Sequence, residues 1–177
     1  MIDVNPEDLG NTVISNLKGE EVPLKSVLGE QDTLVVFVRH FGCIFCRTRL
    51  AGLGEHIAAF EDVGIKVMVV GNGTVPMAEA FVEETGLNVP LFTDPTGQVY
   101  ANAGMRRHFG IGPKAMTRAV GAFVRGHRQG RISGDVWQQG GYVVLGQDGQ
   151  VKIHHADTGA GDRIDFTALI SQVRTAA

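Results

Sequence analysis

In the first half of the chain, continuous apolar runs typical of buried strands alternate with apolar residues at helical spacing, and this alternation predicts the strands and helices. Residues 34–38 form a short, continuous run rich in β-branched side chains, which is typical of a strand buried on both faces. Apolar residues over 50–60 recur at helical spacing, and residues 65–70 form a second buried-strand run. Residues 76–86 are typical of a helix that a proline opens and a glycine ends. The alternation predicts a sheet covered by helices on both faces.

Shorter patterns lie on either side of this unit. They predict two short strands around a turn, a short extended segment, a short helix, a hairpin and a final helix. The hairpin prediction rests on Asp148-Gly149 between two apolar runs, which is a strong turn signal. The segments concerned are residues 12–28, 89–93, 98–103, 142–145, 151–154 and 164–173. Together the patterns predict an α/β fold with a mixed sheet.

Composition narrows the class of protein. The 177 residues and the 44% hydrophobic content fit one packed domain, which we expect to span residues 1–177. A net charge of −3 argues against binding to nucleic acid. We find no apolar run long enough to cross a membrane and no apolar stretch near the acidic N-terminus that is typical of a signal peptide. The cytoplasm is therefore the expected compartment.

Residues 105–137 differ from the rest of the chain. They carry seven Arg or Lys residues and a single acid, Asp135. We expect a helical, basic insertion here, with Pro113 opening a helix. A solvated helix face is the favoured interpretation, and an anion-binding role is the alternative. The function of this segment stays open.

The only two cysteines, Cys43 and Cys46, lie where the first strand run gives way to a helix. A pair at this spacing can close into a disulfide ring and reopen. The first thiol lies at the positive end of the helix dipole, which stabilises the attacking thiolate form. In a reducing compartment such a pair indicates redox or metal chemistry rather than a structural crosslink. Buried, unreactive thiols are the alternative.

Cationic residues next to the pair are candidates for stabilising the thiolate. Arg39 is the favoured one, with Arg47 on the other side and His40 as a weaker candidate. Because side chains alternate along a strand, at most one of Arg39 and His40 is expected to face the thiols. A zinc site is a weaker interpretation. A structural site needs four ligands, and only one of the adjacent His154 and His155 could join the cysteines.

The segment Phe-Val-Arg-His-Phe-Gly-Cys-Ile-Phe-Cys-Arg (residues 37–47) resembles the peroxiredoxin-like branch of the alkyl hydroperoxide reductase / thiol-specific antioxidant superfamily. Thr93-Asp94-Pro95 with nearby Tyr100, the segment 137–141 and residues 154–162 are also similar to that branch. The resemblance covers about residues 17–173. It implies a thioredoxin-like fold, a mixed sheet flanked by helices on both faces, and thiol-dependent oxidoreductase activity.

The chain departs from true peroxiredoxins at the cysteines. Their motif, Pro-x-x-x-Thr-x-x-Cys, puts Cys46 at the attacking position, with Arg39 in place of Pro and Cys43 in place of Thr. The arginine that they supply from a later strand has no match in Gln139-Gly140-Gly141. The thioredoxin pattern makes Cys43 the attacking thiol and Cys46 the resolving one. We favour Cys43, because the first thiol of such a pair is normally the accessible one.

The resemblance and the cysteine pair together predict a thiol–disulfide oxidoreductase, or peroxiredoxin-like antioxidant protein, with Cys43, Cys46 and Arg39 as its catalytic residues. No bound cofactor is required. Thioredoxin or another thiol reductant is the expected partner, and the substrate is a small-molecule or protein disulfide, or a peroxide. Two alternatives remain. One is a hydroperoxide-reducing peroxidase in which Cys46 attacks, and the other is a non-enzymatic redox sensor or interaction module.

Overall fold

A mixed seven-stranded sheet forms the centre of the molecule in this computed structural model, which describes residues 4–106, 135, 137–159 and 162–176. The strands are β1 (Val13–Ser15), β2 (Glu21–Pro23), β3 (Asp32–Val38), β4 (Ile65–Gly71), β5 (Leu91–Thr93), β6 (Gly141–Leu145) and β7 (Val151–Ala156). They lie in the order β2-β1-β5-β4-β3-β6-β7. β3, β4 and β5 are parallel neighbours, and the other pairs are antiparallel. The mixed α/β sheet predicted from the sequence is confirmed.

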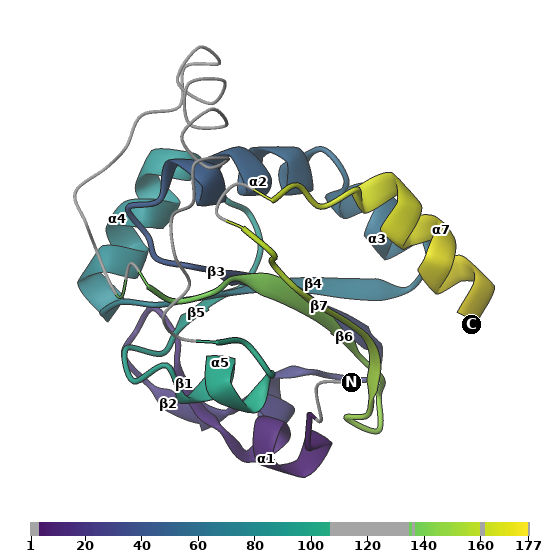
Figure 1. Ribbon diagram of the computed structural model, residues 1–177, viewed down its shortest axis with the longest axis horizontal. Coiled ribbons are helices and arrows are strands. Elements are labelled where there is room, and N and C mark those ends of the chain that lie inside the picture. Colours follow the sequence, from purple (N-terminus) through teal and green to yellow (C-terminus); the bar gives the residue numbers. More distant parts are fainter. Residues whose placement is uncertain (1–3, 107–134, 136, 160–161, 177) are drawn as a thin grey trace.

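Helices cover both faces of the sheet (Figure 1). One face carries α2 (Ile44–Gly54), α3 (Ile57–Asp62), α4 (Val75–Thr85) and α7 (Phe166–Ala176). The other carries α1 (Pro6–Asn11) and α5 (Gln98–Asn102), and a short 3-10 helix, η1 (Leu24–Val27), follows β2. None of the described helices is long and apolar enough to span a membrane.

The central strand β3 separates two cores. Its side chains alternate, so that Leu34, Val36 and Val38 pack with the helices of the first face. Val35 and Phe37 pack on the other face, in the second core. All five side chains are fully buried, as the continuous apolar run predicts. β3 therefore ends at a fixed point between two packed layers, directly before the cysteines.

The predicted helix over residues 50–60 is in fact two helices, because α2 ends at Gly54 and α3 begins at Ile57. Two glycines, Gly52 and Gly54, weaken the helix here. The His56 ring then donates from Nδ1 to the Gly52 carbonyl oxygen at 2.8 Å, and this bond stabilises the break. The final helix begins at Phe166 rather than at 164, since the Asp165 carboxylate accepts a hydrogen bond from the Ala168 amide at 2.9 Å.

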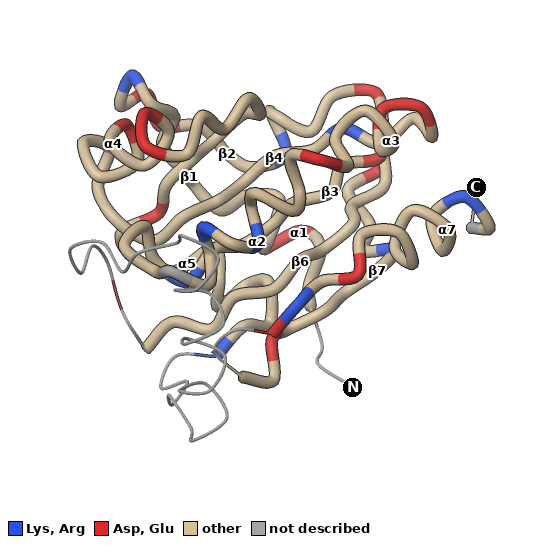
Figure 2. The backbone as a smooth tube through the Cα atoms, turned by 90° about the horizontal axis from the view of Figure 1, so that it is seen from above, with Lys and Arg blue, Asp and Glu red and all other residues tan. Residues whose placement is uncertain are grey.

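The other predicted elements agree with the structure, with small shifts in their ends. Gly86 ends α4 with φ 63°, a left-handed conformation that glycine adopts without strain. The Asp148-Gly149 hairpin joins β6 to β7. The basic insertion predicted over 105–137 lies almost entirely outside the described residues. Charged residues of both signs are interspersed over the part of the chain that is described, with acidic positions on α3 and α4 and basic ones on α2 (Figure 2).

Candidate active site

Cys43 and Cys46 lie at the junction of β3 and α2, as the sequence predicts. Cys43 is the N-cap residue of α2, and Cys46 lies one turn further on. The Cys43 amide donates to the His40 carbonyl oxygen at 3.1 Å, which closes the tight connection between strand and helix. Both residues are reduced cysteines. The thiols therefore meet where unsatisfied amide groups of the helix concentrate positive potential.

The pKa of Cys43 falls from its ordinary 9.0 to about 6. Hydrogen bonding from the Cys46 thiol is the largest cause, and it outweighs burial, which acts in the opposite direction. The Cys46 and Phe45 amides and the charge of Arg39 lower the pKa further. Neither amide makes a capping hydrogen bond of normal geometry with the sulfur, so they act mainly as oriented dipoles. At neutral pH Cys43 is mostly thiolate.

The pKa of Cys46 moves the other way and lies well above its ordinary value. Its thiol is the hydrogen-bond donor to Cys43, so it holds its proton, and burial and the negative charge on Cys43 act in the same direction. The charge of Arg49 and the His40 amide oppose the shift. At neutral pH one thiol of the pair is thus ionised while the other stays protonated.

Arg39 and His40 surround the pair on the strand side. Arg39 is 3% exposed, and its Nε donates to the Gln138 carbonyl oxygen at 3.1 Å. Burial, followed by the Arg39 charge, lowers the pKa of His40 to about 4, so the imidazole is neutral at pH 7. Its Nδ1 is buried with no hydrogen-bond partner among the described residues. Arg39 is therefore the cation whose charge lowers the pKa of Cys43.

Exposure does not distinguish the two thiols, and the expectation that Cys43 is the accessible one is wrong. Both residues are 2% exposed. Phe41 covers the connection and is buried in the core. Its ring fills the space beside Gly71 and Gly73, where an added Cβ would lie 2.2 Å and 2.7 Å from ring carbons, and it packs against Phe81. Burial of this turn therefore covers both sulfurs.

Sequence reasoning gave no role at the thiol site to three residues that lie near it. The first is Arg49, three positions after Cys46, and this helical spacing, which places the two on one helix face, could have identified it. The other two are Asp157, which forms an ion pair with Arg49, and the fully buried Tyr100, and both come from distant segments of the chain. The Tyr100 hydroxyl donates to the Val38 carbonyl oxygen at 2.6 Å and fixes the end of β3.

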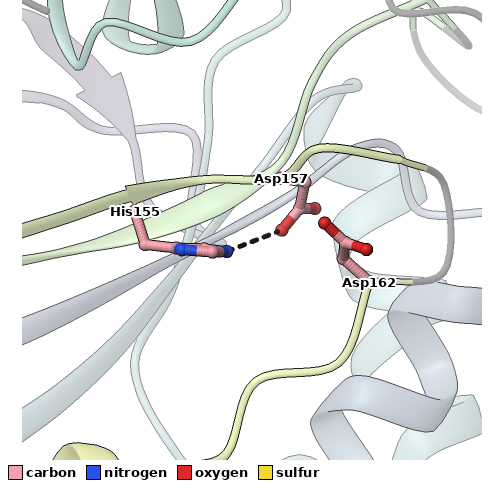
Figure 3. Close-up of side chains that lie close together, drawn as sticks. All are labelled: His155, Asp157 and Asp162. Atoms are coloured by element: carbon pink, nitrogen blue, oxygen red, sulfur yellow. Dashed lines mark ion pairs between the residues drawn. The ribbon is translucent and has the colours of Figure 1, made fainter.

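His155, Asp157 and Asp162 form the group of potential metal ligands found among the described residues (Figure 3). Their ligand atoms lie within 4.8 Å of one another. However, Asp157 Oδ1 already accepts a hydrogen bond from Arg49 at 2.8 Å, and Asp162 Oδ2 accepts two from Thr158. A guanidinium at this distance repels a divalent cation. These side chains therefore hold Arg49 in place rather than form a metal site.

The zinc interpretation of the cysteines gains no ligand from the predicted histidines. His154 Nε2 donates to the Ala103 carbonyl oxygen at 2.8 Å, on the second face of the sheet. His155 stacks on Tyr142, with ring centroids 5.0 Å apart, and faces Asp157. The two histidines thus point to opposite faces of β7 and bind other groups.

A cavity of about 560 Å³ opens at the carboxyl ends of β4 and β5. Ligands of open α/β sheets bind at this end of parallel strands. Gln138, whose carbonyl oxygen binds Arg39, lines the cavity together with Asn72, Thr74 and Asp135. The described lining includes neither cysteine. Gln138 therefore links the cavity to Arg39 of the thiol site.

Known proteins similar to this chain in sequence or structure agree with the fold described above. The family model for AhpC/TSA antioxidant enzymes matches residues 52–159. The chain belongs to this family. A prostamide/prostaglandin F synthase of Xenopus tropicalis is 29% identical over 96% of this chain and 88% of its own length. A chloroplastic thioredoxin-like protein AAED1 of Arabidopsis thaliana is 29% identical over 79% of this chain, which spans only 60% of that protein.

Solved structures of other proteins share this fold. A cysteine-to-serine mutant of peroxiredoxin Q from Xanthomonas campestris aligns over 100% of this chain and 98% of its own, with a TM-score of 0.71 and 14% identity. The resemblance to the peroxiredoxin-like branch of the thioredoxin-like superfamily is confirmed. The matched family segment begins after Cys46, so the role of the cysteine pair rests on its own geometry.

Proposed function

We propose that the protein is a thiol–disulfide oxidoreductase of the peroxiredoxin-like class, with Cys43 as the attacking thiolate and Cys46 as the resolving thiol. The opposite pKa shifts of the two neighbouring thiols carry this proposal. The pKa of Cys43 lies below neutrality because Cys46 donates to it, and the pKa of Cys46 is raised for the same reason. A pair of unreactive buried thiols would have both pKa values raised by burial.

The reaction proceeds in two exchanges. The Cys43 thiolate attacks one sulfur of a substrate disulfide, forms a mixed disulfide and releases the other sulfur as a thiolate. Cys46 then loses its proton to the solvent or to that thiolate and attacks the Cys43 sulfur. The Cys43–Cys46 disulfide forms, and the second half of the substrate leaves as a thiolate. Two electrons pass from the pair to the substrate.

A second dithiol must return these two electrons. Thioredoxin or another thiol reductant of a compartment such as the cytoplasm would do so by the same exchange chemistry, with no bound cofactor. The substrate class is a small-molecule or protein disulfide. Membership of an antioxidant enzyme family supports a hydroperoxide as a second oxidant. Cys43 would then form a sulfenic acid and release an alcohol or water, and Cys46 would displace water from it.

The structure supports Cys43 rather than Cys46 as the first nucleophile for either oxidant. A thiol whose pKa is raised well above 9.0 contains little thiolate at neutral pH. Since both sulfurs are buried, a substrate reaches them only when the connection around Phe41 opens. Such local opening is common at functional sites, and it makes the reaction rate depend on the opening equilibrium.

The test is turnover and disulfide mapping in the purified protein. Thioredoxin-coupled oxidation of NADPH is followed with a disulfide and with a panel of hydroperoxides, and the Cys43–Cys46 bond is identified by mass spectrometry. We expect Cys43→Ser to abolish turnover and Cys46→Ser to trap a mixed disulfide on Cys43. Turnover that survives replacement of both cysteines would overturn the proposal, and oxidation at Cys46 first would favour the peroxidase alternative. Slow cycling combined with oxidation-dependent partner binding would indicate a sensor.

A further inference from the structure

Arg49 and Asp157 form a buried ion pair one helical turn from Cys46. Arg49 Nη2 donates to Asp157 Oδ1 at 2.8 Å and to the Asp162 carbonyl oxygen at 2.9 Å. The two side chains are 6% and 2% exposed. The pair joins α2 to the segment after β7, although the partners are 108 residues apart in the sequence.

Asp157 is fixed from several sides. Its amide donates to the Gly140 carbonyl oxygen at 2.9 Å, and Gln139 Nε2 donates to its carbonyl oxygen. Figure 3 shows the Asp157 and Asp162 carboxylates close together beyond the end of β7, with the His155 ring directed at Asp157. An Arg49 side chain bound to such a support has little freedom, so its other terminal nitrogen, Nη1, is held in place.

Arg49 Nη1 is buried and has no hydrogen-bond partner in the described part of the chain. Buried charged donors without partners are rare in native proteins, and a functional role is one of the few explanations for them. Arg49 shares a helix face with Cys46, and Cys46 is buried in the core beneath α2. The charge of Arg49 also lowers the pKa of Cys46, so the spare donor belongs to a cation that interacts with the second thiol.

We propose that Arg49, positioned by Asp157, stabilises the negative charge that forms on Cys46 when this thiol resolves the mixed disulfide. This inference rests on the proposed function of the pair. Asp157 is a positioning residue, since it acts through Arg49. The chain thereby supplies from α2 a cation that the sequence comparison with true peroxiredoxins does not find at Gln139-Gly140-Gly141.

The arrangement sets the order of the two steps. While Cys43 is a thiolate, it accepts the Cys46 proton and its charge opposes ionisation of Cys46. Once Cys43 is bound in a mixed disulfide, this charge and this acceptor are gone. Burial still opposes ionisation, but the charge of Arg49 and the His40 amide now act against burial alone. Cys46 therefore becomes able to ionise only after Cys43 has reacted.

Other ionisable groups face these side chains and share in the pH dependence. Tyr100 from α5 and Cys43 from the start of α2 face Cys46, and Arg39 from the end of β3 faces Cys43. The groups that face Arg49 and its anchor Asp157 are Asp162 and His155. Any measured pH profile of the second step thus reports this set, and the Arg49 variants isolate one member.

The experiment separates the two exchanges with dithiodipyridine, a neutral disulfide that releases an absorbing thiopyridone at each step. Attack by Cys43 releases the first thiopyridone and leaves the second on Cys43. Attack by Cys46 on the Cys43 sulfur releases the second and forms the intramolecular disulfide. The rates of both phases are recorded against pH for the full chain and for Arg49→Met, Arg49→Lys and Asp157→Asn.

We expect Arg49→Met to raise the pH midpoint of the second phase by roughly one pH unit or more and to slow it about tenfold at pH 7. The first phase should keep its midpoint. Arg49→Lys should recover part of the loss, because it keeps the charge without the fork. Asp157→Asn should give an intermediate shift, because it frees Arg49 from its support.

Two variants guard against a purely structural explanation. The double variant Arg49→Met with Asp157→Asn removes both charges and leaves no unpaired buried ion, so it should fold and show the same second-phase midpoint as Arg49→Met. Lys152→Met is the control. Lys152 lies on β7 and forms an ion pair with Asp32 of β3 at 2.7 Å, so the variant also removes a cation from an ion pair but not from the thiol site. It should change neither midpoint.

The outcomes separate the two proposals. A wild-type chain that gives two phases and an Arg49→Met chain with an unchanged second-phase midpoint would overturn this inference and leave the proposed function intact. Equal slowing of both phases at every pH, in the double variant as well, would indicate a structural role only. A wild-type chain with no second phase and no Cys43–Cys46 disulfide would overturn both.

Discussion

Replacing Cys46 by alanine or by serine isolates the hydrogen bond that acts on Cys43. The pKa of Cys43 falls from 9.0 to about 6, with the Cys46 thiol as the largest cause. This fall corresponds to about 4 kcal/mol of preference for the thiolate. A hydrogen bond to a charged group contributes about 1.5–3 kcal/mol, or roughly one to two pH units. Alanine removes this donor, whereas serine keeps a hydroxyl donor in nearly the same place.

We expect the Cys43 pKa to rise to between about 7 and 8 in Cys46→Ala and to stay near 6 in Cys46→Ser. The measurement is the rate of alkylation by iodoacetamide against pH, with the modified cysteine identified by mass spectrometry. The midpoint of the profile is the quantity to compare. The rate at one pH is less informative, because a more basic thiolate is a better nucleophile and offsets part of its smaller population.

A midpoint that stays near 6 in Cys46→Ala would refute this reasoning and leave Arg39 and the helix amides as the cause. A midpoint near 9 in Cys46→Ser would refute it as well. The same shift predicts a stability change. Because the folded pKa of Cys43 lies below the unfolded one, its contribution is complete above pH 9.0 and is lost as the pH falls through about 6. The free energy of unfolding should therefore rise less between these values in Cys46→Ala than in Cys46→Ser.

Arg39, Gly71 and His40 give three further predictions. Arg39→Met should raise the alkylation midpoint of Cys43 and Arg39→Lys should raise it less, since the Arg39 charge lowers this pKa. Gly71→Ala should destabilise the fold by about 1–3 kcal/mol in urea denaturation, because its Cβ would lie 2.2 Å from the Phe41 ring. Gly54→Ala is the control. Its Cβ would meet open space, so this variant should be neutral or stabilising. The pKa of His40 is lowered to about 4 in the folded chain, so between pH 6.5 and about 4 the unfolded chain binds a proton that the folded chain does not. The free energy of unfolding should therefore fall by up to about 3 kcal/mol as the pH drops across this window. A His40→Gln variant with the same pH dependence would contradict this.

Local sequence patterns were sufficient for most of the fold. The runs that became β3 and β4 are apolar throughout because both faces of the sheet are covered, and this is visible without a structure. Gly86 and Asp148-Gly149 mark a helix end and a hairpin through conformations that few other residues adopt. The break between α2 and α3 was less visible, since its hydrophobic spacing continues from Leu53 to Phe60 and only the ring of His56 distinguishes it.

The positions of the candidate site residues that are neighbours in sequence could be predicted, and those of the distant ones could not. Cys43, Cys46 and Arg39 are neighbours in sequence, so their meeting at a strand–helix junction could be inferred from spacing. Arg49 and Asp157 are 108 residues apart in the sequence, and their contact depends on where β7 ends relative to α2. No periodic pattern of apolar residues predicts a contact over that sequence separation. The exposure of Cys43 was mispredicted for a related reason, because it depends on Phe41 packing against glycines of β4 and its following turn.

Burial and reactivity of Cys43 are linked, and the link limits how the site can open. Burial by itself raises the pKa of this thiol, and the low pKa of about 6 exists only because the Cys46 thiol, two helix amides and Arg39 are arranged around it. An opening that unwinds the first turn of α2 would expose the sulfur but remove three of these four groups. An opening that displaces Phe41 alone would admit a substrate and keep them. The reactive open state should therefore retain the first turn of α2. The Arg47 amide donates to the Cys43 carbonyl oxygen at 3.1 Å and closes that turn, so its hydrogen exchange should give a smaller opening constant than the alkylation rate of Cys43 gives. Equal opening constants would mean that the helix unwinds when the site opens.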